Sequence, residues 1–103
     1  MAFILVKWIH DFPEEPVLLY SEIDEKRREV RKVHMFRDGS AHFADRERHS
    51  GRTRLSGDPV PSLAELGRQK EFQPHEISAK DFEDVWNWAV GSGKYAGAKK
   101  SSL

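Results

Sequence analysis

The segment that most constrains the fold is residues 2–9, which consists almost entirely of β-branched, aromatic and other apolar side chains. In an extended chain these side chains point to both faces: Phe3, Leu5 and Ile9 to one, and Ile4, Val6 and Trp8 to the other. Apolar groups on both faces are typical of an interior strand that is covered on both sides. A buried helix is the alternative. However, the segment is short, and Asp-Phe-Pro-Glu-Glu-Pro follows at once with two prolines that cannot continue a helix, so we predict a strand.

Further strand-like segments follow before any helical pattern. Residues 17–23 predict a second strand and residues 28–36 a third. Asp38-Gly39 stands between this third strand and Ser-Ala-His-Phe-Ala, which predicts a hairpin with a two-residue type I′ turn. Such a turn would place Arg37 opposite Ser40, Met35 opposite His42, and His34 opposite Phe43. Residues 53–55 could add a short edge strand.

A capping box predicts a short helix in the C-terminal half. Ser62 is followed three residues later by Glu65, the pattern in which each side chain bonds the backbone of the other residue. Leu63 and Leu66 would form the buried side of this helix, and Gly67 would end it. We interpret Pro74 as a break after this helix.

The last helix is predicted over residues 79–90. Ser78 and Asp81 repeat the capping pattern at its start, with Asp in place of the usual Glu. Apolar residues at helical spacing form one stripe: Phe82, Val85, Trp86 and Ala89. We expect Gly91 to end the helix, and residues 92–103, which are small and polar, to form a flexible tail.

Strands followed by helices predict an α+β fold. We expect an antiparallel sheet of four or five strands covered by the C-terminal helix, with one additional short helix, in a single domain of residues 1–91. The chain has 103 residues, of which 38% are hydrophobic, enough for one modest core. Trp8, Phe36 and Trp86 are the anchors expected between sheet and helix.

Composition and the N-terminal residues exclude several classes of protein. No apolar run approaches the ~18 residues that a membrane span needs. The N-terminal segment lacks the basic region of a signal peptide. The chain has no cysteine, which excludes disulfides, thiolate catalysis and cysteine-ligated metals. We therefore expect a cytoplasmic protein with no membrane partner and no cofactor.

The formal net charge of zero hides a segregation of charge along the chain. Residues 11–25 hold six acidic residues and no Lys or Arg, whereas residues 26–54 hold ten basic residues against four acidic ones. One hypothesis is that the two sets bind charged partners. The acidic candidates are Asp11, Glu14, Glu15, Glu22 and Asp24, and the basic candidates are Arg46, Arg48, Arg52 and Arg54. The alternative is that the acidic second strand simply pairs with the basic third strand.

Trp88 lies two residues beyond Trp86 and therefore points away from the apolar stripe of the last helix. A partly exposed Trp is a common interface anchor. The alternative is that Trp88 packs on the sheet edge or on residues 59–61.

Catalytic motifs are weakly represented. None of the five histidines belongs to a His-Glu-x-x-His motif, and the chain contains neither Gly-x-Ser-x-Gly nor a glycine-rich phosphate loop. His10, His34 and Glu22 lie on or beside predicted strands that could be neighbours, where they would suit a metal or acid–base chemistry. A structural role is the alternative for each histidine. We predict no catalytic residue and no metal site.

A set of short motifs is spread over residues 5–90: Trp8-Ile9-His10-Asp11, Pro13-Glu14-Glu15-Pro16, Tyr20-Ser21-Glu22-Ile23-Asp24, Arg31-Lys32-Val33, Phe36-Arg37-Asp38-Gly39, Pro59-Val60-Pro61 and Phe82-Glu83-x-x-Trp86. The set resembles a family of small bacterial domains of unknown function. Their Trp-x-His-Asp-x-Pro-x-Glu-Pro opening leads into a Tyr-Ser-Glu strand. The resemblance implies no particular activity. In size and style the chain is also similar to the cysteine-free α+β domains that serve as immunity proteins beside bacterial toxins.

Three hypotheses for function follow. The first is a small non-enzymatic protein-binding domain, in its most concrete form an immunity or antitoxin-like protein that neutralises a bacterial toxin. The second is a nucleic-acid-binding domain that uses the basic stretch 26–54 with Phe36, His42 and Phe43, although zero net charge counts against it. The third is a small hydrolase or nuclease that uses His10, His34 and Glu22. The oligomeric state stays open.

Overall fold

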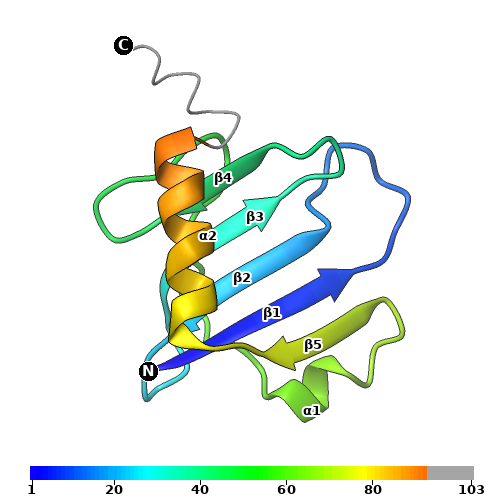
Figure 1. Cartoon of the computed structure of the whole chain (residues 1–103). Coiled ribbons are helices and arrows are strands. Elements are labelled where there is room, and N and C mark those ends of the chain that lie inside the picture. The colour runs from blue at the N-terminus through cyan, green and yellow to red at the C-terminus, as the bar shows by residue number, and fades with distance from the viewer. Residues whose placement is uncertain (93–103) are drawn as a thin grey trace.

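The computed structural model describes residues 1–92, which form a five-stranded antiparallel sheet with a long helix across one face (Figure 1). The strands are β1 (Ala2–Trp8), β2 (Leu18–Ile23), β3 (Glu29–Met35), β4 (Ala41–Ala44) and β5 (Phe72–Glu76), and the helices are α1 (Leu63–Leu66) and α2 (Ala79–Ser92). The strand order is β4-β3-β2-β1-β5, so β1 is an interior strand as predicted. The predicted α+β fold is confirmed.

Helix α2 begins and packs as its sequence predicts. The Ser78 hydroxyl accepts a hydrogen bond of 3.0 Å from the Asp81 backbone N–H. Most of the apolar stripe is buried against the sheet, in a core formed by Phe82, Trp86, Ala89, Val33, Ala41 and Phe43. Gly91 does not end the helix, which continues to Ser92, because a glycine near a helix terminus costs only about 1 kcal/mol. Ser92 was expected in the tail, and the rest of the predicted tail lies outside the described residues.

Of the three expected anchors, only Trp86 lies between sheet and helix. Phe3 packs against the core beneath α2, so strand alternation places Trp8 on the opposite face of β1. Val33 likewise faces α2, which places Phe36 on the opposite face. The expectation for Trp8 and Phe36 was therefore wrong, and both side chains line a cleft on the other side of the sheet.

The β3–β4 hairpin has a three-residue loop, not the predicted two-residue turn. Phe36 N–H donates to the Ser40 carbonyl at 2.8 Å and Gly39 N–H to the Phe36 carbonyl at 2.9 Å. Gly39 has a φ of 90°, which is the left-handed glycine of a turn closed by a bulge. The register therefore pairs His34 with His42, where the sequence predicted His34 with Phe43. A shift of one residue exchanges the two faces, so Phe43 lies beneath α2 and His42 on the opposite face.

The fifth strand is β5, which the sequence analysis missed because it contains Pro74. Backbone hydrogen bonds from Ile9 to Glu71 (2.8 Å) and from Ile77 to Phe3 (2.9 Å) flank its pairing with β1. Hydrogen-bonded and non-hydrogen-bonded residue pairs alternate along this ladder, so the backbone of Pro74 faces the outer edge of the sheet. A residue without an N–H is tolerated there. The edge strand predicted at residues 53–55 was wrong, because these residues form no strand.

A long connection, residues 45–62, runs from β4 towards α1 across the face opposite α2. Basic side chains of the β2–β3 hairpin hold it there. Lys32 Nζ donates to the Arg54 carbonyl at 2.9 Å, and Arg27 Nε donates to the Val60 carbonyl at 2.7 Å. The connection ends at Ser62, which forms the predicted capping box with Glu65 at the start of α1. On this face Ile4 and Val6 of β1 are buried, so β1 has apolar side chains on both sides of the sheet.

Candidate functional site

A cleft of about 660 Å³ lies on the sheet face opposite α2. Side chains of the strands and their ends form its floor: Trp8, Leu19, His34, Phe36 and His42. The β1–β2 loop forms one side with Glu14, Glu15 and Pro16, and the long connection forms the other with Gly51, Arg52, Thr53 and Arg54. Segments far apart in the sequence therefore enclose a single site.

The His42 side of the floor is fixed by several contacts. His42 Nδ1 lies 3.1 Å from the Ser50 hydroxyl, and its ring meets Phe36 edge-on at 5.5 Å between centroids. Ser50 is held in turn by Phe43, because its hydroxyl accepts from the Phe43 N–H at 2.9 Å and its own N–H donates to the Phe43 carbonyl at 2.8 Å. Gly51 has a φ of 57°, and a side chain there would meet the His42 ring at 2.9 Å. The close approach of the connection to β4 thus requires glycine.

His34 stands beside His42 on the floor but has different surroundings. Burial, together with the nearby Lys32 and His42, lowers the pKa of His34 to about 3. The imidazole is therefore neutral at neutral pH, a state in which it both donates and accepts hydrogen bonds. Within residues 1–92 the His34 side chain has no hydrogen-bond partner. A polar side chain that has no hydrogen-bond partner and lies on the floor of a cleft is suited to form hydrogen bonds with a ligand.

An aromatic cluster around Trp8 supports the acidic side of the cleft. The Trp8 ring lies 4.2 Å from that of His10 and 6.2 Å from that of Phe72, between centroids. His10 Nε2 lies 2.8 Å from the Pro16 carbonyl, and His10 Nδ1 accepts from the Phe12 N–H at 2.9 Å. His10 therefore shapes the β1–β2 loop, in agreement with the structural alternative considered for it.

Charges of opposite sign face the cleft from its two sides. Glu14 and Glu15 are exposed on the loop, and Arg52 is exposed on the connection. Arg54 is tied down, because its Nη1 donates to the Gly51 carbonyl at 3.1 Å and the Thr53 carbonyl at 3.2 Å. No ion pair within the described part of the chain involves Glu14, Glu15 or Arg52. These three charges are therefore available to a partner.

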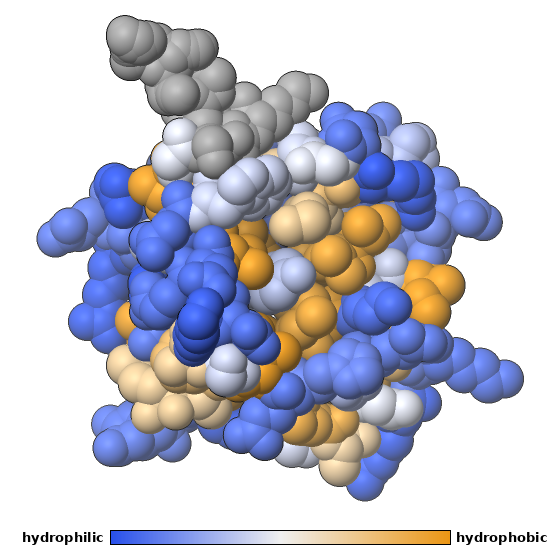
Figure 2. Space-filling view, viewed as in Figure 1, coloured by the Kyte–Doolittle hydropathy of each residue, from blue (hydrophilic) through white to orange (hydrophobic). Residues whose placement is uncertain are grey.

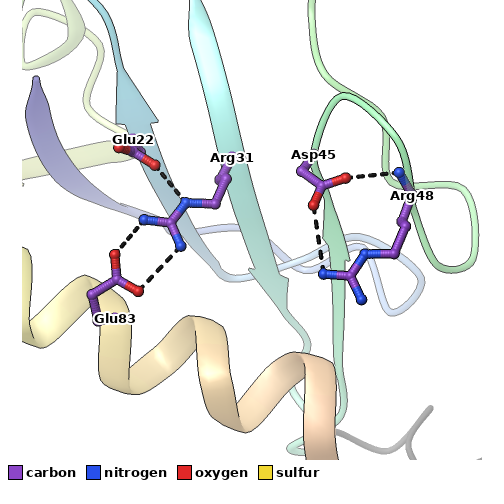
Figure 3. Close-up of polar contacts among 5 residues, drawn as sticks. All are labelled: Glu22, Arg31, Asp45, Arg48 and Glu83. Carbon is purple, nitrogen blue, oxygen red and sulfur yellow. Dashed lines mark hydrogen bonds and ion pairs between the residues drawn. The ribbon is translucent and has the colours of Figure 1, made fainter.

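Glu22, an acidic candidate, is not on an accessible surface. Its side chain is 10% exposed and accepts a hydrogen bond of 2.5 Å from Arg31 Nε on the α2 side of the sheet (Figure 3). Arg31 also forms a two-pronged contact with Glu83 of α2 and stacks 5.1 Å from the Trp86 ring. The placement of Glu22 in a partner-binding surface was therefore wrong. The alternative, that the second strand pairs its charge with the third, holds for this residue.

Two further acidic candidates lie outside the cleft. Asp24 caps the β2–β3 turn, where its Oδ1 accepts from the N–H groups of Arg28 and Lys26 at 2.9 Å. These hydrogen bonds, that from Arg28 first, lower the pKa of Asp24. Asp11 is exposed on the β1–β2 loop and does not line the cleft.

The basic candidates divide between two places. Arg52 and Arg54 line the cleft, whereas Arg46 and Arg48 lie on the turn beyond β4. Arg48 Nη2 forms an ion pair of 3.5 Å with Asp45, whose side chain also caps that turn (Figure 3). Two of the four arginines singled out from the sequence therefore line the cleft.

Trp88 lies on the other side of the molecule, beside an apolar groove between α2 and the β3–β4 hairpin. The side chain is 38% exposed, and Met35 and Val85 line the groove with it. Figure 2 shows apolar surface on this face next to α2. The predicted anchor is therefore partly exposed but remote from the cleft.

The structure does not bring His10, His34 and Glu22 together. His34 lies on the cleft floor, His10 supports the neighbouring loop, and Glu22 is beneath α2. Within residues 1–92 no three His, Asp or Glu side chains are grouped so that they could hold a metal ion. In the same residues no helix has the length and apolar character to cross a membrane.

Sequence reasoning missed the aromatic and imidazole floor of the cleft. Trp8 and Phe36 were assigned to the opposite face, and His42 was placed in a different register. The signal that could have found them is the alternation of β1, since Trp8 shares a face with Ile4 and Val6 and not with Phe3.

Residues 2–91 match a family described as a domain of unknown function (DUF6881), so the chain belongs to this family. No curated protein and no solved structure matches the chain. The family covers the whole sheet and nearly all of α2, including every residue of the cleft.

Proposed function

We propose that this member of the family is a small non-enzymatic protein-binding domain and that its partner docks in the cleft opposite α2. The observation that carries the proposal is the placement of unpaired Glu14, Glu15 and Arg52 around a floor containing Trp8 and Phe36. Protein interfaces combine an aromatic and apolar centre with a charged rim in this way. The rim charges raise the rate of association and select the partner.

His34 and Glu22, the pair considered from the sequence for acid–base catalysis, are poorly suited to it in the fold. A catalytic acid or base works best when its pKa lies near the operating pH. Burial keeps the pKa of His34 at about 3, far below that range. The carboxylate once considered beside it, Glu22, is engaged with Arg31 on the other face. These features support binding over catalysis.

The form of the function that we favour is neutralisation of a bacterial toxin in the cytoplasm. A small domain that blocks an active site needs one preformed surface and no chemistry of its own. The acidic loop with Glu14 and Glu15 would complement the basic surface of a nuclease toxin, and Arg52 would fix the orientation. The size and the absence of cysteine match the immunity-protein style noted from the sequence.

Affinity capture with matched variants tests the proposal. Bait proteins would be the natural chain, a cleft variant with Glu14→Lys and Glu15→Lys, and a control with Lys80→Glu and Asp84→Lys, which reverses an exposed ion pair on α2. Each capture from the source lysate is run with and without nuclease and quantified by mass spectrometry. We expect a stoichiometric protein that survives nuclease, is retained by the control and is lost from the cleft variant. Equal capture by all three baits contradicts the proposal.

Nucleic-acid binding remains the second candidate, and it is favoured by Arg46 and Arg52, which are exposed and form no ion pair within residues 1–92. The basic stretch as a whole supports it less, because Arg27, Arg31 and Lys32 are engaged in contacts within the fold. Phe43, expected to stack on bases, is buried against Trp86. Captured material that disappears with nuclease would favour this candidate.

A further inference from the structure

We infer that the cleft binds an extended segment of the partner that carries side chains of both signs. A basic side chain of the segment contacts Glu14 and Glu15, and an acidic side chain contacts Arg52. The inference rests on the proposed protein-binding function and deepens it by naming the chemistry of the bound segment.

The charges of the cleft select against ligands of a single sign. Glu14 and Glu15 stand on the β1–β2 loop, and Arg52 stands on the connection across the floor. A purely acidic segment or a nucleic acid would meet repulsion from the two glutamates, and a purely basic segment would meet repulsion from Arg52. A segment with one charge of each sign satisfies both sides in one orientation only. The cleft therefore recognises the direction of the segment as well as its composition.

The floor supplies what the middle of an extended segment needs. Trp8, Leu19 and Phe36 offer apolar contact for side chains between the two charges. His34 is neutral and has no hydrogen-bond partner within residues 1–92, so it can donate to a backbone carbonyl or accept from a backbone N–H. The cleft volume of about 660 Å³ lies within the range of sites that enclose small ligands, so it accommodates a short stretch of chain.

A displayed library of random dodecapeptides tests the inference without the natural partner. The library is selected on the natural chain, on Glu14→Lys with Glu15→Lys, on Arg52→Glu, and on the α2 control Lys80→Glu with Asp84→Lys. We expect the natural chain and the control to enrich peptides with a basic and an acidic residue at a fixed separation and order. The glutamate variant should exchange its preference for a basic residue for an acidic one, and the Arg52 variant should exchange its preference for an acidic residue for a basic one. For a selected peptide, each reversal should weaken binding about fivefold or more, the effect of one exposed ion pair of about 1 kcal/mol.

A separate NMR experiment identifies where on the protein a selected peptide binds. The three tryptophans give three indole N–H signals, of which Trp8 reports the cleft, Trp86 the core and Trp88 the far side. A selected peptide should shift the Trp8 signal and leave that of Trp88 in place. The unchanged Trp86 signal shows that each variant is folded.

Several results would overturn the inference. These are enrichment of peptides of one sign only, enrichment that the cleft variants do not alter, no enrichment at all, and a shift of Trp88 in place of Trp8. A shift of the Trp8 signal by an RNA oligonucleotide, with none by any peptide, would overturn it in favour of nucleic acid. The proposed function is judged independently by the capture experiment, in which a protein lost from the cleft variant supports it even when no mixed-charge peptide is selected.

Discussion

Arg31 and Glu22 face each other across β3 and β2 and form an ion pair (Figure 3). The rings of Phe82 and Trp86 from α2 pack against the Arg31 guanidinium. The Arg31 guanidinium lies 5.0 Å from the Phe82 ring centre and also contacts Glu83 of α2. Charges that look in the sequence like parts of two separate surfaces thus neutralise each other inside the fold. The charges that remain for a partner are those on loops, where no strand register supplies an opposite charge.

We predict that Arg31→Met destabilises the protein by about 3 kcal/mol. The change leaves the carboxylate of Glu22, 10% exposed, without its partner, and an uncompensated buried charge is strongly unfavourable. Glu83→Gln should cost no more than about 1 kcal/mol, because the Glu83 side chain is 46% exposed. Urea unfolding of both variants measures the difference. Similar losses of stability in the two variants would show that the buried Glu22 carboxylate does not depend on its ion pair with Arg31.

A pH dependence is expected from His34. Its pKa in the folded chain is about 3, whereas an unperturbed histidine has 6.5. Between these values the unfolded chain binds a proton that the folded chain does not, so stability falls as pH is lowered through this window. The slope is at most about 1.4 kcal/mol per pH unit.

Urea unfolding at several pH values between 7 and 5 tests this contribution, since this range lies above the titration of most carboxylates. His34→Gln should flatten the pH dependence, whereas His75→Gln, at an exposed position of β5, should leave it unchanged. An unaltered slope in His34→Gln would mean that the imidazole is charged in the folded protein.

Gly51→Ala should disturb the cleft floor as well as the backbone. A left-handed backbone costs a non-glycine residue about 1–2 kcal/mol, and this applies equally to Gly39→Ala in the β3–β4 loop. At Gly51 the added carbon would also lie 2.9 Å from the His42 ring, whereas at Gly39 no atom lies within 4 Å. We therefore expect both variants to be destabilised, with the His42 ring signals displaced in NMR only for Gly51→Ala. Unchanged His42 signals would show that the connection, and not the ring, moves.

Lys32→Met should loosen the connection that forms the basic side of the cleft. The side chain joins the Arg54 carbonyl and the Glu29 carboxylate, each at 2.9 Å, and hydrogen bonds from charged groups contribute about 1.5–3 kcal/mol. We expect trypsin to cleave after Arg52 and Arg54 about tenfold faster in this variant, because local opening exposes the chain. Lys26→Met, at an exposed turn residue, is the control. Equal cleavage of the two variants would show that Lys32 does not hold the connection.

Local patterns predicted much of the fold. The positions of β1, β2, β3 and α2 follow from short-range alternation, capping residues and helical spacing, all of which act within one element. The hairpin register was wrong, because Asp-Gly suits both a two-residue turn and a three-residue loop with a left-handed glycine. β5 was missed, because Pro74 is acceptable only at a sheet edge and the sequence does not show which strand lies there.

The candidate site was predicted only in its loop residues. Glu14, Glu15, Arg52 and Arg54 were singled out by charge, and the structure brings all four to one cleft. Their proximity depends on how the connection crosses the sheet, which contacts such as that of Lys32 with Arg54 decide. Those contacts join residues distant in the sequence, and no local pattern encodes them.

Each outer strand of the sheet has a position at which a further strand could not form the full set of main-chain hydrogen bonds. On β4 the N–H and carbonyl of Phe43 already bond Ser50 of the same chain, and on β5 Pro74 has no N–H to offer. A second molecule would therefore find no template for a sixth strand at these positions, which protects the protein from growing into fibres at high concentration. For the partner that we propose, strand-to-strand pairing at these two positions is therefore blocked, and recognition depends on side chains such as those that line the cleft. Strand-to-strand pairing accepts almost any sequence, so its blockage at these positions favours the contacts that distinguish one partner from another.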